Sequence, residues 1–288
     1  MTSLDPDPHH GSHKQALLDE LERFYDAVPR KGARTEDFGP LTLFVREGQG
    51  WPYYARPTPG WAGAAATAAD VLRVLTRQRE LGLPESFEWV AEVTPQLRAA
   101  VEGAGLVVHE HPLLVLTETP TADAAPAPKH VAVRVLDLGD PALAGALAVA
   151  NLAFDDPGTE VGEAGLAELA QAVRLCVADG AVERAEQRIA AGVSAVAAAV
   201  ADGAALSAGQ YQAAGAVCEL VGIGTLPSAR RNGLGLAVTA ALVEHARARG
   251  VRTVFLSASD ENVARIYRRA GFRDTATALI AEPAPVAP

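Results

Sequence analysis

The chain has few of the residues and segments that mark secreted, zinc-binding or membrane-spanning proteins. Among 288 residues there are two cysteines, Cys176 and Cys218, too few and too isolated for a disulfide framework or a zinc site. No uninterrupted apolar run reaches membrane-spanning length, and the N-terminal stretch is polar and His-rich. We therefore expect a protein of the reduced cytoplasm, with no metal site and no membrane contact.

Positive charge is also scarce. Lys and Arg number 25 against 35 Asp and Glu, which gives a formal net charge of −10. This balance argues against non-specific binding of nucleic acid and mildly favours a cationic amine as a substrate. The chain is 49% hydrophobic and long enough that two lobes are expected rather than one.

Changes in composition divide the chain into four parts. Residues 1–34 contain an unpatterned tail, expected to be disordered over 1–14, followed by a helix. Residues 35–119 are expected to form a small α/β lobe, and the Pro/Ala-rich residues 120–129 a linker. Residues 130–288 are expected to form the main domain.

Hydrophobic periodicity predicts alternating helices and strands in both lobes. In the first part of the chain we expect helices at 16–25, 64–81 and 95–102, and strands within 41–56 and at 87–92 and 106–116. In the main domain we expect helices at 141–154, within 163–190, at 235–249 and at 261–270, and strands at 131–136, 193–200, 204–213, 216–226, 252–258 and 272–282.

The most informative stretch lies between a strand and a helix of the main domain. The strand breaks at Pro227, the basic, glycine-rich turn Arg230–Gly235 follows, and a helix-forming run comes next. Glycines let backbone N–H groups converge on a phosphate, the helix N-terminus adds partial positive charge, and arginines neutralise the anion. The spacing matches neither the P-loop nor the dinucleotide fingerprint. Arg-x-x-Gly-x-Gly is one of several patterns that can hold a pyrophosphate.

Two signatures in the right order resemble a known family. Arg230-x-x-Gly233-x-Gly235 looks like the acetyl-CoA pyrophosphate loop of the GNAT N-acetyltransferase superfamily. A strand and a helix later, Tyr267 precedes Ala270-Gly271-Phe272, which is similar to the family's second signature. The resemblance implies an α/β (α+β) fold, with a mixed, mostly antiparallel sheet flanked by helices.

The resemblance covers roughly residues 131–288, and the first lobe repeats it faintly. There, helix, strand and helix end in Ala104-Gly105-Leu106, an internal echo of the later signature. The stretch Pro57–Gly63 stands where a basic phosphate loop would be and contains no cation. We interpret residues 35–119 as a degenerate GNAT-like lobe that does not bind CoA. An unrelated small α/β lobe is the alternative.

The resemblance implies that acetyl-CoA is the co-substrate and indicates where it binds. The loop and the start of the helix are expected to hold its pyrophosphate with charged side chains and backbone N–H groups: Arg230, Arg231, Asn232, Gly233, Leu234, Gly235 and Leu236. Ile223, Gly224 and Thr225 are expected to pair with the pantetheine arm like an added strand. The alternative is a solvated turn at the start of a helix.

Glu219 is the candidate general base for the amine. It stands among apolar residues on the central strand, where burial would raise its pKa toward the useful range. It also precedes Arg230 by eleven residues, the spacing found in the histone acetyltransferases that this family resembles. A water-bridged or different carboxylate is the alternative, and Asp155, Asp156 and Glu160 are the rivals.

Tyr267 is the candidate general acid, since the family places a Tyr at this helix position near the CoA sulfur. A phenol there can protonate the leaving thiolate. The alternative is a Tyr of the hydrophobic core. Many family members carry an Asn where this chain has Asp260, which we expect to cap the helix instead. Gly222 and Gly224 fit an irregular strand that would aim a backbone N–H at the acetyl oxygen.

The predicted function is acetyl-CoA-dependent N-acetylation of a primary amine by direct transfer. A non-catalytic acyl-CoA-binding protein is the alternative from another class. An acyltransferase that uses another acyl group or a hydroxyl acceptor is a further one. The expected partner is a small-molecule or peptide amine, with a homodimer possible and no nucleic acid, and the sequence carries no signature of the acceptor.

Overall fold

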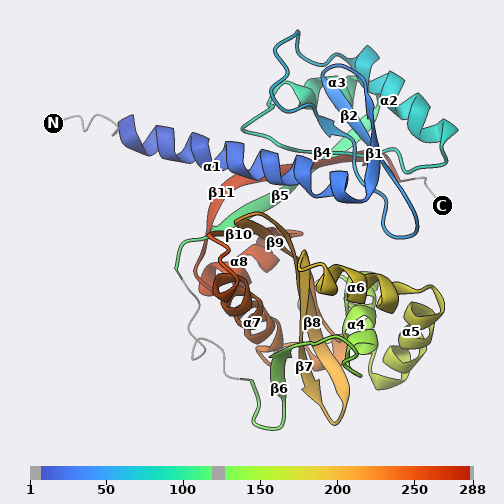
Figure 1. The fold of residues 1–288 in the computed structure, drawn as a ribbon, viewed down its shortest axis with the longest axis vertical. Helices are drawn as coiled ribbons and strands as arrows, with labels where there is room; N and C mark the ends of the chain where they lie inside the picture. The colour runs from blue at the N-terminus through green and yellow to red at the C-terminus, as the bar shows by residue number, and fades with distance from the viewer. Residues whose placement is uncertain (1–7, 119–126, 286–288) are drawn as a thin grey trace. The chain divides into compact units, whose positions relative to one another are not determined.

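The computed structural model describes residues 8–118 and 127–285, and the chain divides into two compact units (Figure 1). Unit 1 comprises Met1–Leu113 and Thr275–Pro288, and unit 2 comprises Leu114–Asp274. The chain passes between the units within two strands, β5 (Leu106–Leu116) and β11 (Phe272–Pro283). Each unit therefore contains the end of a strand that the predicted boundaries assigned to the other half of the chain.

Among the described residues, unit 1 combines a small antiparallel sheet with three α-helices, a 3-10 helix, strand β4 and parts of the two crossing strands. The antiparallel sheet has the order β1-β2-β3, and β4 pairs antiparallel with β11, where Trp89 lies opposite Leu279. Its elements besides the crossing strands are α1 (Pro8–Ala27), the 3-10 helix η1 (Pro29–Lys31), β1 (Ala33–Asp37), β2 (Leu41–Arg46), β3 (Arg56–Pro57), α2 (Ala68–Glu80), β4 (Phe87–Val90) and α3 (Leu97–Gly103). Phe87 and Trp89 of β4 are fully buried in the core of this unit.

In the first part of the chain, the first helix begins earlier than predicted, and the structure contains one strand that was not predicted. Residues 8–14, predicted to be disordered, begin helix α1. Strand β1 was not predicted because its sequence, ARTED, has no apolar alternation, and its side chains are indeed mostly exposed. Residues 1–7 of the predicted tail and 120–126 of the predicted linker lie outside the described residues.

Unit 2 contains a mixed, mostly antiparallel sheet, as predicted. Its strands follow the order β6-β7-β8-β9-β10-β5; the pairs β6–β7, β7–β8 and β8–β9 are antiparallel, and the pair β9–β10 is parallel. The elements are β6 (Ala132–Val135), α4 (Leu143–Asp155), α5 (Leu166–Ala178), α6 (Ala181–Ala190), β7 (Ser194–Ala201), β8 (Ala204–Ala214), β9 (Val217–Thr225), the 3-10 helix η3 (Pro227–Ala229), α7 (Leu234–Ala248), β10 (Thr253–Ser257) and α8 (Glu261–Arg269).

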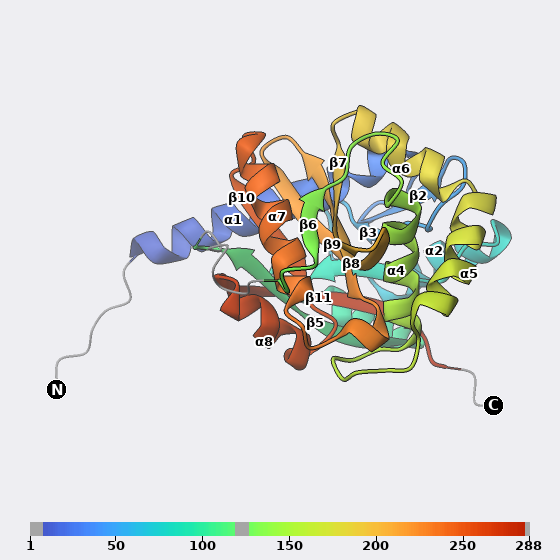
Figure 2. The ribbon, with the colours of Figure 1, turned by 90° about the horizontal axis from the view of Figure 1, so that it is seen from below.

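Helices cover both faces of this sheet, with α7 on one side and α4 on the other (Figure 2). Strand β7 contributes side chains to two hydrophobic clusters, one on each face of the sheet. Its residues Ala195, Ala197 and Ala199 pack into the cluster that contains α7, whereas Val196 and Ala198 pack into the cluster that contains α4. Side chains alternate between the faces of a strand, so a continuous apolar run such as SAVAAAVA indicates a strand buried on both faces.

The order predicted as an internal echo is helix, strand, helix, strand, and it occurs as α2, β4, α3, β5 and again as α7, β10, α8, β11. In unit 1, a parallel bridge joins Ala55 to Phe87 of β4, and α3 and β5 follow. In unit 2, β9 pairs in parallel with β10, and α8 and β11 follow. Each unit thus has a parallel strand contact, then a helix, then a strand that continues into the other unit.

Gly224 lets helix α4 lie directly on strand β9. A Cβ at this position would be 2.7 Å from the Cβ of Ala153 and 3.4 Å from the Cα of Ala150, both on α4. Because α4 comes this close to β9, only glycine fits at position 224 without displacing the helix. The approach brings the C-terminal end of α4 beside the end of β9.

We expect Gly224→Ala to destabilise unit 2 because the added methyl group forces α4 away from β9. Overpacking of this kind costs about 1–3 kcal/mol. Gly145→Ala is the matched control: Gly145 lies in α4, the helix that packs on Gly224, and an added Cβ there would be an ordinary 3.5 Å from the Cβ of Ala205. That change should be stabilising by about 0.5–1 kcal/mol, since alanine favours a helix interior. Calorimetric melting of both variants tests the packing, and a Gly224→Ala protein as stable as wild type would contradict it.

Candidate functional site

The site lies where β9 and β10 stop pairing. The two strands pair from Val217 with Thr253 to Glu219 with Phe255, and no pair is formed beyond that point among the described residues. Gly222 then adopts φ +62°, and the register between β8 and β9 shifts by one residue. This is a β-bulge, and it confirms the irregularity expected at Gly222.

A cleft of about 1220 Å³ opens at this divergence, and its lining comes from unit 2 alone. One side is formed by β9 and the loop before α7, another by the end of β10 with α8, and a third by the C-terminal end of α4 and the segment that follows it. The lining residues are Ala153, Phe154, Pro157–Glu160, Leu220–Thr225, Arg230, Arg231, Gly233, Leu236, Leu256, Ser257, Ser259, Asn262, Val263, Arg265–Tyr267 and Arg269.

In the loop between β9 and α7, several backbone N–H groups have no acceptor among the described residues. Arg231 at φ +68° and Gly233 at φ +72° both take the left-handed conformation, and α7 begins at Leu234 without a side-chain cap. Among the hydrogen bonds of the described residues, none is donated by the N–H groups from Arg231 to Leu236. Consecutive unpaired N–H groups at a helix N-terminus bind anions, helped by the helix dipole.

Asn232 and Leu234 shape the loop rather than line the cleft. The Asn232 amide donates hydrogen bonds to the backbone oxygens of Ala229 at 3.1 Å and Arg230 at 3.2 Å. Leu234 is buried in the core beneath α7. Of the residues predicted to hold the pyrophosphate, these two and Gly235 do not line the cleft, and the remaining four do.

The two arginines of the motif have different environments. The Arg230 side chain is 7% exposed, and its guanidinium donates hydrogen bonds to backbone oxygens in the last turn of α4 and in the segment that follows it. The Arg231 side chain is 64% exposed, with the Glu160 carboxylate 4.0 Å away. Arg231 is therefore the cation of the motif that is accessible to a ligand.

The predicted pantetheine residues Ile223, Gly224 and Thr225 all line the cleft. On the β8 side, Ser207 donates a 2.8 Å hydrogen bond to the backbone oxygen of Gly224, and its hydroxyl lies 3.0 Å from that of Thr225. On the β10 side, β9 carries no ladder pair beyond Glu219 in the described part of the chain. That edge can take an extended ligand as an added strand.

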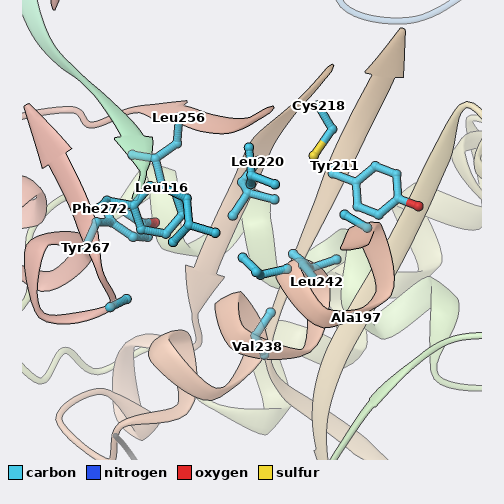
Figure 3. Close-up of a cluster of buried hydrophobic side chains, with 14 of the residues drawn as sticks. Leu116, Ala197, Tyr211, Cys218, Leu220, Val238, Leu242, Leu256, Tyr267 and Phe272 are labelled. Carbon is cyan, nitrogen blue, oxygen red and sulfur yellow. The ribbon is translucent and has the colours of Figure 1, made fainter. Parts of the chain in front are cut away.

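Tyr267 reaches the cleft from α8. Its ring packs edge-on against Phe272, with 6.0 Å between the ring centres, near Leu116 (Figure 3). Burial raises the pKa of the Tyr267 phenol above its ordinary value of 10, because the phenolate would lose solvation. The side chain thus both packs in the core and lines the cleft, and it is protonated at neutral pH.

Glu219 is buried, but it does not line the cleft as the described residues define it. Its neighbours Cys218 and Leu220 point into the core beneath α7 (Figure 3), so its side chain points to the other face of the sheet. The carboxylate that does line the cleft is that of Glu160, whose side chain is 89% exposed. Cys218 is buried, and burial raises the pKa of its thiol to about 12, so it is not a reactive thiol at neutral pH.

Helix α8 supplies lining residues that were not predicted. Asn262, Arg265, Ile266 and Arg269 face the cleft at the i, i+3, i+4 and i+7 spacing of one helix side. That spacing is visible in the sequence and could have been used to find them. Asp260 accepts hydrogen bonds from the N–H groups of Asn262 and Val263 at 2.7 and 3.0 Å, so it caps α8 as predicted.

No group of three or more His, Cys, Asp or Glu side chains in the described part of the chain is placed to hold a metal ion. No helix within the described ranges is long and apolar enough to cross a membrane.

Comparison with known proteins agrees with the predicted fold and family. A model of the Acetyltransferase (GNAT) family matches residues 169–272. A 71-residue segment is 42% identical to a mycothiol acetyltransferase of Cellulomonas flavigena, but the match spans 24% of this chain and 20% of that protein.

Solved structures share the fold over nearly the whole chain. A GCN5-related N-acetyltransferase from Kribbella flavida is 21% identical, with a TM-score of 0.67 over 94% of this chain and 96% of that one. A GCN5-related N-acetyltransferase-like protein from Streptococcus suis is 13% identical, with a TM-score of 0.55 over 93% and 99% of the two chains. At these identities the likeness is one of fold.

The fold and the site define a two-unit α/β protein with a glycine-rich, basic loop at a split in its sheet. Residues 169–272, within unit 2, form an acetyltransferase domain of the GNAT family. The family predicted from the two signatures is thereby confirmed for this domain.

The raised pKa of Tyr267 predicts how stability depends on pH. The unfolded chain releases this proton near pH 10, whereas the folded protein retains it, so the stabilising contribution is present below pH 10 and is lost as the pH rises further. Between about pH 9 and about pH 11, wild type should lose about 1 kcal/mol more stability than Tyr267→Phe. Urea midpoints of both proteins measure this difference, and parallel pH profiles would show that the phenol ionises as freely as in the unfolded chain.

Proposed function

We propose that this protein transfers an acetyl group from acetyl-CoA to a primary amine, directly and within a ternary complex. The observation that carries the proposal is the composition of the cleft. Besides Arg230, whose charge is compensated by carbonyl oxygens and Asp156, the described lining residues include three arginines and one carboxylate, in a chain whose formal net charge is −10. A concentration of positive charge in an acidic protein suits a ligand with several phosphates.

The cleft fits the parts of CoA in order. The diphosphate would sit on the N–H groups from Arg231 to Leu236 at the start of α7, with the Arg231 side chain beside it. The pantetheine arm, which carries amide groups, would pair with the free edge of β9 at Ile223–Thr225. Arg265 and Arg269 lie on the α8 side, where a further phosphate group can be bound.

The side chains at the inner part of the cleft suit acyl transfer. Acetyl-CoA, when bound, supplies the acetyl group as a thioester. Tyr267 would donate its proton to the departing sulfur, and its raised pKa keeps that proton in place at neutral pH. The bulge at Gly222 would aim a backbone N–H at the acetyl oxygen, where negative charge develops.

We propose Glu219 as the acceptor of the amine proton, through water in the cleft. What supports this is that Glu219 is buried and directly precedes Leu220, which lines the cleft where β9 leaves β10, although the Glu219 side chain itself does not line it. Glu160 is the alternative because it lines the cleft itself. For the acceptor, the curated relative is by its name a mycothiol acetyltransferase, so mycothiol-related amines belong among the first to be tried.

Titration calorimetry with CoA tests the binding half of the proposal. Wild type should bind with a micromolar Kd, about −8 kcal/mol. Gly233→Glu should abolish binding, because it places a carboxylate among the N–H groups that face the diphosphate. Gly203→Glu is the matched control: Gly203 has the same left-handed backbone, with open space around it, in the β7–β8 turn.

Release of free thiol from acetyl-CoA over a panel of amines tests the catalytic half. Turnover with a primary amine supports the proposal. Tight CoA binding without turnover on any amine or alcohol would support the acyl-CoA-binding alternative. Equal CoA affinity of wild type and Gly233→Glu would end the assignment of the loop.

The identity of the base is decided by two isosteric variants. With an amine from the panel, Glu219→Gln should lower kcat/KM by about 100-fold or more and remove its acid limb, as expected for loss of a general base. Glu160→Gln should change kcat/KM by less than about threefold, as expected for an exposed charge at the rim. The reverse ranking would assign the base to Glu160.

A further inference from the structure

Arg230 belongs to the phosphate-loop motif, yet its guanidinium is turned toward another segment. It donates hydrogen bonds to the backbone oxygens of Glu160 at 3.1 Å, of Ala153 at 3.3 Å and of Asp156. The Asp156 carboxylate lies 3.6 Å from the same guanidinium. These contacts connect the phosphate loop to the segment 153–160.

Two backbone hydrogen bonds continue this connection. The Gly162 N–H donates to the Pro227 oxygen at 3.1 Å, and the Ser228 N–H donates to the Ala164 oxygen at 3.0 Å. Gly162 packs tightly here, since a Cβ on it would lie 2.9 Å from the Cβ of Pro227. The chain from the end of α4 to the start of α5 is therefore held against the loop at several points.

The residue type at position 230 follows from this geometry. A guanidinium has five N–H donors in a planar fork, so one side chain can reach several carbonyl oxygens at once, whereas an ammonium is a compact point charge. The Arg230 side chain is 7% exposed, and a buried charge requires such partners. A ligand phosphate would have to compete with partners already in place.

The segment held by Arg230 is one wall of the cleft. Ala153, Phe154 and residues 157–160 line it, facing the end of β9. We propose that Arg230 is a positioning residue that fixes this wall to the phosphate loop, and that Arg231 is the side chain of the motif that neutralises the diphosphate. The part concerning Arg231 rests on the function proposed above, whereas the part concerning the wall does not.

Hydrogen–deuterium exchange and CoA titration on the full chain separate the two roles. The variants are Arg230→Ala, Arg230→Lys and Arg231→Ala, with Arg174→Ala as the control. Arg174 is an exposed arginine of α5 outside the cleft, so its loss changes the net charge equally. Exchange of the amides of residues 156–164 reports on the wall, and exchange of the central strand β9 reports on global folding.

For Arg230→Ala and Arg230→Lys we expect exchange at 156–164 to rise at least about tenfold, the effect of losing about 1.4 kcal/mol of local stability. Exchange of β9 should be unchanged, and the CoA Kd should stay within about threefold of wild type. For Arg231→Ala we expect a Kd about tenfold weaker, as for loss of a charge-assisted contact, with exchange at 156–164 unchanged. Arg174→Ala should change neither measurement.

The lysine variant distinguishes position from charge. If Arg230→Lys restored wild-type exchange at 156–164, a point charge would suffice and the bridging role would be wrong. If Arg230→Ala weakened CoA binding as much as Arg231→Ala and left exchange unchanged, Arg230 would be a phosphate ligand instead.

With an amine from the panel, Arg230→Lys should raise the KM for the amine at least about fivefold, with kcat within about twofold of wild type. If CoA does not bind at all, the exchange data still decide the role of Arg230, while the proposed function fails.

Discussion

The candidate site depends on one feature of the sheet: β9 and β10 pair in parallel for a short distance and then separate. Pairing ends at Glu219 and Phe255, and β9 then bulges at Gly222. Separation leaves one edge of β9 without ladder hydrogen bonds and opens the cleft beside it. The same divergence places the loop before α7 at the mouth of the cleft, because β9 leads directly into it. A sheet paired along its full length would have neither the free edge nor the space.

The cleft is lined mainly by positively charged side chains, whereas the whole chain has a negative net charge. Arg231, Arg265 and Arg269 line the cleft together with the N-terminal end of α7, although acidic residues outnumber basic ones overall. Arg230 contributes differently, because its charge is already compensated by carbonyl oxygens and by Asp156. One short motif therefore supplies a structural cation and an accessible one. Arg231 has a left-handed backbone, and its side chain is exposed, whereas the neighbouring Arg230 side chain is buried.

Much of the fold could be predicted from periodicity. Strand β5 has the predicted bounds, and most helices and strands of unit 2 lie within one or two residues of theirs, because their apolar patterns are strong. Strand β1 was missed because it is a polar strand. The unit boundaries were displaced because β5 and β11 each continue from one unit into the other, and strand length in sequence does not show where a core ends. Both signatures lie within unit 2, where the family model matches.

The sequence by itself determined the turn before α7, since Gly233 adopts the left-handed conformation at the helix start without a steric cost. It also determined the cap at Asp260, which is a local hydrogen bond. Only the tertiary structure decided that Arg230 faces a segment some seventy residues earlier in the chain, and that Glu219 lies on the sheet face away from Leu220 and the core beneath α7. The physical reason is that these outcomes depend on long-range packing, and a pattern of neighbouring residues does not encode which distant carbonyl oxygens will be near a side chain.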